Sequence, residues 1–104
     1  MNKKDVLFLL SQIKKHKDRW EIRRFSLLIE ELLYETDSET ADIISRLIRT
    51  GKLNTVACAL ENYISRATVY RRIEGFCRLV IYSSRLKGDE RIYLRCIASL
   101  RKNL

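Results

Sequence analysis

The chain has no proline and only three glycines among its 104 residues. Proline and glycine most often interrupt helices and form tight turns, so long uninterrupted segments are expected. Within these segments apolar residues recur three and four positions apart, the spacing that places side chains on one face of an α-helix. The sequence therefore predicts an all-α fold of five to six helices within a single domain, residues 1–104.

The first half of the chain, residues 1–52, is predicted to supply three helices of the core. The first covers residues 3–16 and the second residues 18–35, both rich in apolar side chains. The run Thr36-Asp37-Ser38-Glu39 is a capping-box pattern, with a hydroxyl at the cap and a glutamate three residues later. It opens a third helix, which Thr50-Gly51 ends because glycine accepts a left-handed backbone conformation.

The second half, residues 53–104, is predicted to begin with a short helix over residues 55–61. Asn54 is its cap, and a turn at residues 61–64 follows it. The apolar residues that this helix is expected to turn inward are Val56, Ala57 and Leu60.

A longer helix is predicted to begin at Ser65, whose hydroxyl can accept hydrogen bonds from backbone N–H groups two or three residues ahead. Apolar residues then follow at steps of four, three and four, so they form one buried stripe. The stripe consists of Val69, Ile73, Phe76 and Val80. Residues 79–82 also favour β structure, so a very short β wing and a loop at residues 83–88 are expected next. Asp89 then caps the last helix.

Positive charge is concentrated near the C-terminus. Residues 1–63 contain eleven Lys and Arg against ten Asp and Glu, a balance of +1, whereas residues 64–104 contain ten against three, a balance of +7. A segregated positive charge of this kind is typical of a surface that binds a polyanion. The alternative is a solvated basic face that has no partner.

The exposed faces of the helix over residues 65–80 carry side chains that can hydrogen-bond to DNA. Arg66, Thr68 and Arg71 lie nearest its start, where recognition helices reach base edges in the major groove. Arginine can bind guanine through two hydrogen bonds, and threonine can contact the thymine methyl group. The remaining residues are expected at phosphates or at the helix start. The predicted DNA-binding set is Ser65, Arg66, Thr68, Tyr70, Arg71, Arg72, Arg78, Arg85 and Lys87.

Two runs of residues resemble known regulators. Ile64-Ser65-Arg66-Ala67-Thr68-Val69-Tyr70-Arg71 resembles the start of the recognition helix in bacterial helix-turn-helix regulators. Leu86-Lys87-Gly88-Asp89-Glu90-Arg91-Ile92 resembles the stretch that follows the DNA-binding motif in Mga-type virulence regulators. The first run is also similar to small phage activators related to sigma-factor region four. The resemblance implies a helix-turn-helix fold and a DNA-binding role, with the helix over residues 55–61 as the supporting helix.

The residue types needed by metal sites and by most enzymes are sparse. Cys58, Cys77 and Cys96 include no close pair, so they are predicted to be core thiols in a reducing compartment. The only histidine, His16, lies in a lysine-rich segment far from the cysteines in sequence. We expect neither an enzyme nor a metal or other cofactor. No apolar run approaches the length of a membrane span, so a cytoplasmic protein without a membrane partner is predicted.

These patterns predict a sequence-specific regulator of transcription that binds double-stranded DNA, either as an activator or as a repressor. RNA polymerase is a further partner that this role implies. The apolar residues of segment 3–35 exceed what one stripe per helix requires, so a homodimer through this segment is expected. The alternative is a helical adaptor or inhibitor whose basic C-terminal half docks onto an acidic protein.

Overall fold

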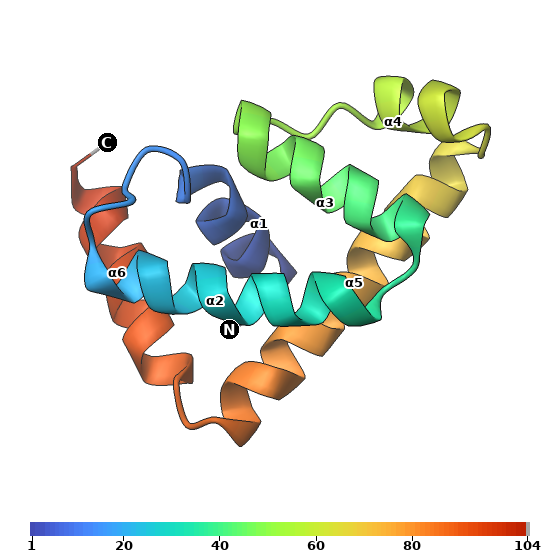
Figure 1. The fold of residues 1–104 in the computed structure, drawn as a ribbon. Helices are drawn as coiled ribbons and strands as arrows, with labels where there is room; N and C mark the ends of the chain where they lie inside the picture. Colours follow the sequence, from blue (N-terminus) through green and yellow to red (C-terminus); the bar gives the residue numbers. More distant parts are fainter. Residues whose placement is uncertain (104) are drawn as a thin grey trace.

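The computed structural model describes residues 1–103 and contains six α-helices (Figure 1). They are α1 (Lys3–Gln12), α2 (Trp20–Glu35), α3 (Ser38–Thr50), α4 (Thr55–Asn62), α5 (Arg66–Leu86) and α6 (Glu90–Lys102). No strand occurs within the described range. The predicted all-α fold of five to six helices is confirmed.

α5 is the helix around which the others are arranged. It packs against each of the five other helices, and α1 in turn packs against α3 and α6. In Figure 1, α5 runs from its start beside α4 to the opposite edge of the molecule, where α6 turns back alongside α2. Buried apolar side chains from all six helices form one continuous cluster. The orientation of α5 is therefore determined by the whole core.

The predicted β wing after Val80 is wrong, because α5 continues to Leu86. Val80 and Ser84 are both fully buried and extend the inward-facing side of the helix. The hydroxyl of Ser84 donates to the carbonyl of Val80 at 2.7 Å, so this buried polar group is satisfied within the helix. Tertiary burial overrides the β preference of residues 79–82. After α5 the chain changes direction at Gly88, whose φ is 73°.

The boundaries of the first two helices also differ from the prediction. α1 ends at Gln12 instead of residue 16, and α2 begins at Trp20 instead of residue 18. Ile13 is still buried, but residues 14–19 are all polar or charged. They offer no apolar face for the core, and helices of this length depend on such burial. Turns therefore connect α1 to α2.

Two of the four predicted helix caps match the structure, and two differ. Asn54 and Ser65 cap α4 and α5 as predicted, and Gly51 ends α3 with a φ of 72°. Asp37, not Thr36, caps α3, with its carboxylate accepting from the backbone N–H of Thr40 at 2.8 Å.

The second exception is Asp89, which precedes α6 without making a side-chain cap hydrogen bond. Its carboxylate accepts instead from Nε of Arg24 on α2 at 2.9 Å, and Asp89 is buried. A buried carboxylate needs a charged or hydrogen-bonding partner. The arginine of a distant helix therefore determines the role of Asp89.

The apolar residues of segment 3–35 are largely covered within a single chain. Leu9, Leu10, Phe25, Leu28 and Leu32 are buried, and α1 and α2 pack against α3, α5 and α6. The apolar surface that this segment leaves exposed is therefore smaller than its number of apolar residues suggested. The large apolar side chains that remain exposed in this segment are Trp20, Leu27 and Tyr34.

Candidate nucleic-acid interface

α4 and α5 are joined by a connection of three residues, Tyr63 to Ser65. Tyr63 has a left-handed backbone with a φ of 56°, and its N–H group donates to the carbonyl of Leu60 at 3.4 Å. The N–H group of Ile64 donates to the carbonyl of Ala59 at 3.0 Å. These bonds end α4 tightly. The predicted turn covered residues 61–64, whereas the observed turn covers residues 63–65 and is one residue shorter, because α4 extends to Asn62.

The inward face of α4 also differs from the prediction. Cys58 and Ala59 are buried and Ala57 is half-buried, but Val56 is 49 % exposed and Leu60 is 71 % exposed. A helix of eight residues is too short for its apolar spacing to determine one face, so packing against α3 and α5 decides which residues are covered.

Ser65 caps α5 and begins a short chain of polar contacts. Its hydroxyl oxygen accepts from the backbone N–H of Thr68 at 3.1 Å and lies 2.9 Å from the hydroxyl of Thr68. A guanidinium nitrogen of Arg71 donates to that same Thr68 hydroxyl oxygen at 3.2 Å. The helix start therefore holds the Arg71 side chain in a defined position before any ligand binds.

The buried stripe of α5 is confirmed, and the opposite face of this helix is open. Val69, Ile73, Phe76 and Val80 are all buried. The exposed side of the helix presents Arg71 between two small residues, Ala67 and Gly75, with Arg78 one turn beyond Gly75. A Cβ atom added at Gly75 would meet nothing within 4 Å. Because Gly75 has no side chain and the space beside it is open, a ligand could approach the backbone closely near Arg71.

Arg66 and Tyr70 lie on another side of α5, beside the start of α4. The hydroxyl of Thr55 and the guanidinium of Arg66 hold the pKa of Tyr70 below its ordinary value, and the ammonium of Lys3 contributes to this shift. Thr55 therefore borders the polar surface of α5, and Lys3 adds positive charge to its surroundings. Neither residue belongs to the predicted DNA-binding set. Thr55 follows the predicted cap Asn54, so its place at a helix start could be recognised, whereas nothing local in the sequence links Lys3 to α5.

The remaining predicted residues are engaged in ion pairs. Arg72 contacts Asp37 and Glu39 at the start of α3, each at 3.1 Å. The other three pairs are Arg78 with Glu74 at 3.2 Å, Arg85 with Glu90 at 2.9 Å and Lys87 with Glu31 at 2.8 Å. Exposed pairs of this kind contribute little stability, so a phosphate could compete for these cations. In the described part of the chain, Arg66 and Arg71 form no ion pair.

The nine predicted residues do not form one site. Arg85 and Lys87 follow Arg66 by about twenty positions, which corresponds to roughly 30 Å along a helix axis. The major groove is about 12 Å wide, so one groove cannot receive both ends of α5. The structure brings together Ser65, Arg66, Thr68, Tyr70, Arg71 and Arg72, with Arg78 two turns further along. We call the exposed surface formed by Arg66, Thr68, Tyr70 and Arg71 the α5 start.

Replacing Ser65 with alanine should lower the free energy of unfolding by about 1 kcal/mol, because the N–H group of Thr68 loses its partner. Chemical denaturation measures this change. Ser45→Ala is the matched control, since Ser45 is exposed in the middle of α3 and caps no helix. Equal stability of the two variants would contradict the capping role.

The three cysteines are buried, as predicted, and burial raises the pKa of Cys77 to about 11. A thiol in this environment remains protonated and unreactive. Within residues 1–103, no group of three or more His, Cys, Asp or Glu side chains is placed to hold a metal ion. Across that same range, no helix combines the length and the apolar character that crossing a membrane requires.

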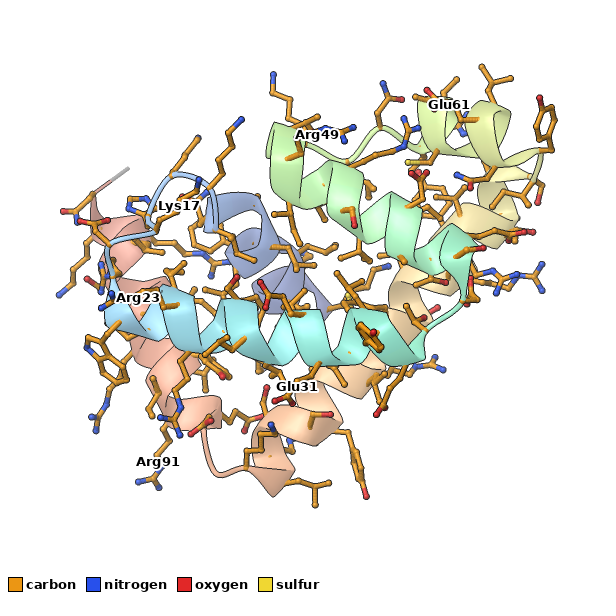
Figure 2. All side chains as sticks on the ribbon, in the orientation of Figure 1. Lys17, Arg23, Glu31, Arg49, Glu61 and Arg91 are labelled. Carbon is orange, nitrogen blue, oxygen red and sulfur yellow. The ribbon has the colours of Figure 1, made fainter. Side chains whose placement is uncertain are left out.

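The candidate interface lies at one end of the molecule. In Figure 2, Glu61 of α4 and Arg91 of α6 occupy opposite ends, so the exposed arginines of α6 are distant from the turn between α4 and α5. Comparison of the chain with protein-family models, with curated protein sequences and with solved structures found no match.

Proposed function

We propose that this chain is a sequence-specific transcription regulator that binds double-stranded DNA and inserts the α5 start into the major groove. The observation that carries the proposal is the pair Arg66 and Arg71. Both are exposed cations without an ion pair in residues 1–103, and they lie in the first turns of a capped helix. Residues 64–104, which contain them, have a charge balance of +7.

The geometry suggests a role for each side chain of the α5 start. Arg71, held by the Thr68 hydroxyl at 3.2 Å, would donate two hydrogen bonds to a guanine. Ala67 would contact a thymine methyl group on the same exposed face. Arg66 and Tyr70 would bind the flanking phosphates together with Lys3 and the N-terminus of α4. Arg72 would chiefly hold α5 against α3, since Asp37 and Glu39 already bind it.

The experiment that tests this function is selection of bound sequences from a random duplex pool. We expect one enriched motif. The logarithm of the binding constant for it should fall linearly with the logarithm of salt concentration, with a slope of about −0.9 for each phosphate contacted. Two results would contradict the proposal: equal affinity for the selected and a scrambled duplex, or binding that does not respond to salt.

We also propose that two copies associate through α2. Trp20, Leu27 and Tyr34 are all exposed and recur every seven residues, so they form one stripe on the solvent side of this helix. A second copy packed on this stripe would cover it and present two α5 helices to DNA. Light scattering should then give the mass of a dimer at micromolar concentration, and Leu27→Glu should give a monomer. A monomeric parent protein would refute this association.

A regulator of this kind would act in the cytoplasm, where RNA polymerase is available as a further partner. The other candidate function is the adaptor or inhibitor that docks onto an acidic protein. Its support is that Arg85 and Lys87 form only surface ion pairs, so carboxylates of a partner could compete for both cations. The duplex selection separates the two, since an adaptor would enrich no sequence.

A further inference from the structure

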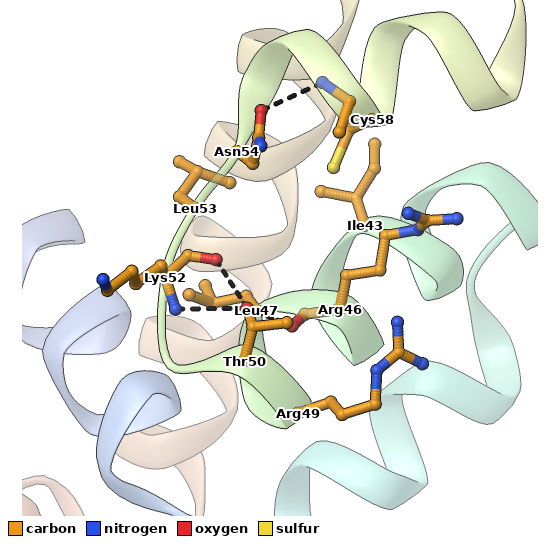
Figure 3. Close-up of a pocket in the computed structure, with 10 residues that line it drawn as sticks. Ile43, Arg46, Leu47, Arg49, Thr50, Lys52, Leu53, Asn54 and Cys58 are labelled. Atoms are coloured by element: carbon orange, nitrogen blue, oxygen red, sulfur yellow. Dashed lines mark hydrogen bonds between the residues drawn. The ribbon is translucent and has the colours of Figure 1, made fainter.

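A cavity of about 190 Å³ lies between the end of α3 and the start of α4 (Figure 3). It is away from the α5 start, and none of the DNA-binding residues proposed above lines it. Its volume is below the range usual for drug-sized ligands, so it suits a molecule of about ten non-hydrogen atoms.

The inner part of this cavity is apolar. Ile43 and Leu47 of α3 and Cys58 of α4 are buried and line it, with Leu53 and Ala57 half-buried at the sides. The thiol of Cys58 remains protonated because burial raises its pKa. No charged group occupies this inner part, so it would accept a hydrocarbon chain or a ring.

The rim of the cavity is cationic, and none of the lining residues is acidic. Arg46 is already neutralised, because its guanidinium forms ion pairs with Asp42 and Glu61. Arg49 and Lys52 form no ion pair among residues 1–103. Figure 3 shows the side chains of Arg46 and Arg49 on one side of the cavity, whereas Lys52 lies on the loop at the opposite side and its side chain extends away from the other two.

The dipoles of α3 and α4 also contribute to the electrostatic potential at the rim of the cavity. Asn54 and Ala57, at the start of α4, both line the cavity, so the positive end of the α4 dipole lies at its rim. The negative end of α3 is nearby, but the ammonium of Lys14 donates to the carbonyl of Arg49 at 3.3 Å and partly offsets it. The positive charges of Arg49 and Lys52 are therefore available to a ligand.

We infer that this cavity binds a small organic anion, with its carboxylate at Arg49 and its apolar body against Leu47, Leu53 and Cys58, while Lys52 on the opposite side adds positive charge to the rim. The inference goes beyond the proposed function and does not depend on DNA binding. An apolar pocket with a few polar or charged groups at its edge is the usual form of such a site.

Isothermal titration calorimetry of the full chain with octanoate tests this inference. We expect saturable 1:1 binding of octanoate, and no binding of octylamine or inorganic phosphate at the same ionic strength. Octylamine has the apolar body with the opposite charge, and phosphate has the charge without the body. Absence of octanoate binding would overturn the inference, and so would equal binding of octylamine or phosphate.

Two variants locate the site. Arg49→Gln/Lys52→Gln should weaken octanoate binding at least tenfold, whereas Arg91→Gln/Arg95→Gln, which removes two exposed arginines of α6, should leave it unchanged. Ala57→Leu fills the cavity while it keeps every cation, and it should abolish binding. A thermal melt of each variant establishes that it is folded. If all folded variants bound octanoate equally, the cavity would not be the site.

Discussion

Replacing Phe25 with alanine should lower the free energy of unfolding by about 3–5 kcal/mol, the usual loss for a buried phenylalanine. Phe25 is fully buried, and its ring meets that of Tyr93 edge-on, with 5.2 Å between centroids and 77° between planes. This contact joins α2 to α6, so the truncation opens a cavity between two helices and removes an aromatic pair as well.

Denaturant unfolding monitored by circular dichroism measures this loss. Leu27→Ala is the matched control on the same helix, because Leu27 is 62 % exposed and its truncation should change stability by less than about 0.5 kcal/mol. The comparison should be made at low protein concentration, so that association through α2 does not contribute. Equal stabilities of the Phe25→Ala and Leu27→Ala variants would contradict the burial of Phe25 and the exposure of Leu27 on α2.

Removing Arg66 and Arg71 together should produce the largest loss of DNA affinity. Arg71, which we place at a guanine, should contribute about 1–3 kcal/mol, and losses at sites without shared partners add approximately. The double variant also loses the phosphate contact of Arg66, so it should bind the selected duplex more weakly than the Arg71 variant alone, by at least about 1–3 kcal/mol relative to the parent. Both side chains are exposed, so the fold should survive. Fluorescence anisotropy at moderate salt concentration measures the change.

Arg91→Ala/Arg95→Ala is the charge-matched control for this experiment. It also removes two positive charges, but from α6, which lies at the other end of the molecule from the α4–α5 turn (Figure 2). A general electrostatic effect would weaken DNA binding equally in both double variants, whereas contacts at the α5 start would weaken it only in the first. Equal losses would therefore remove Arg66 and Arg71 from the proposed reading surface.

The sequence by itself determined the features that depend on neighbouring residues. The cap at Ser65 acts on a backbone group three residues away, and Gly51 ends α3 through its own backbone conformation. The stripe from Val69 to Val80 follows from the period of one helix. Interactions of this range are formed within a single helix and its ends, so helix class and the buried face of α5 could be predicted.

Only the tertiary structure decided which cations of the basic half are free. Lys87 binds Glu31, which lies 56 positions earlier, and Arg72 binds Glu39, 33 positions earlier. The influence of Lys3 on the pKa of Tyr70 and the length of α5 beyond Val80 likewise depend on helices that are distant in sequence. A charge count treats all of these arginines and lysines alike, because an ion pair between helices forms only when packing brings its two residues together.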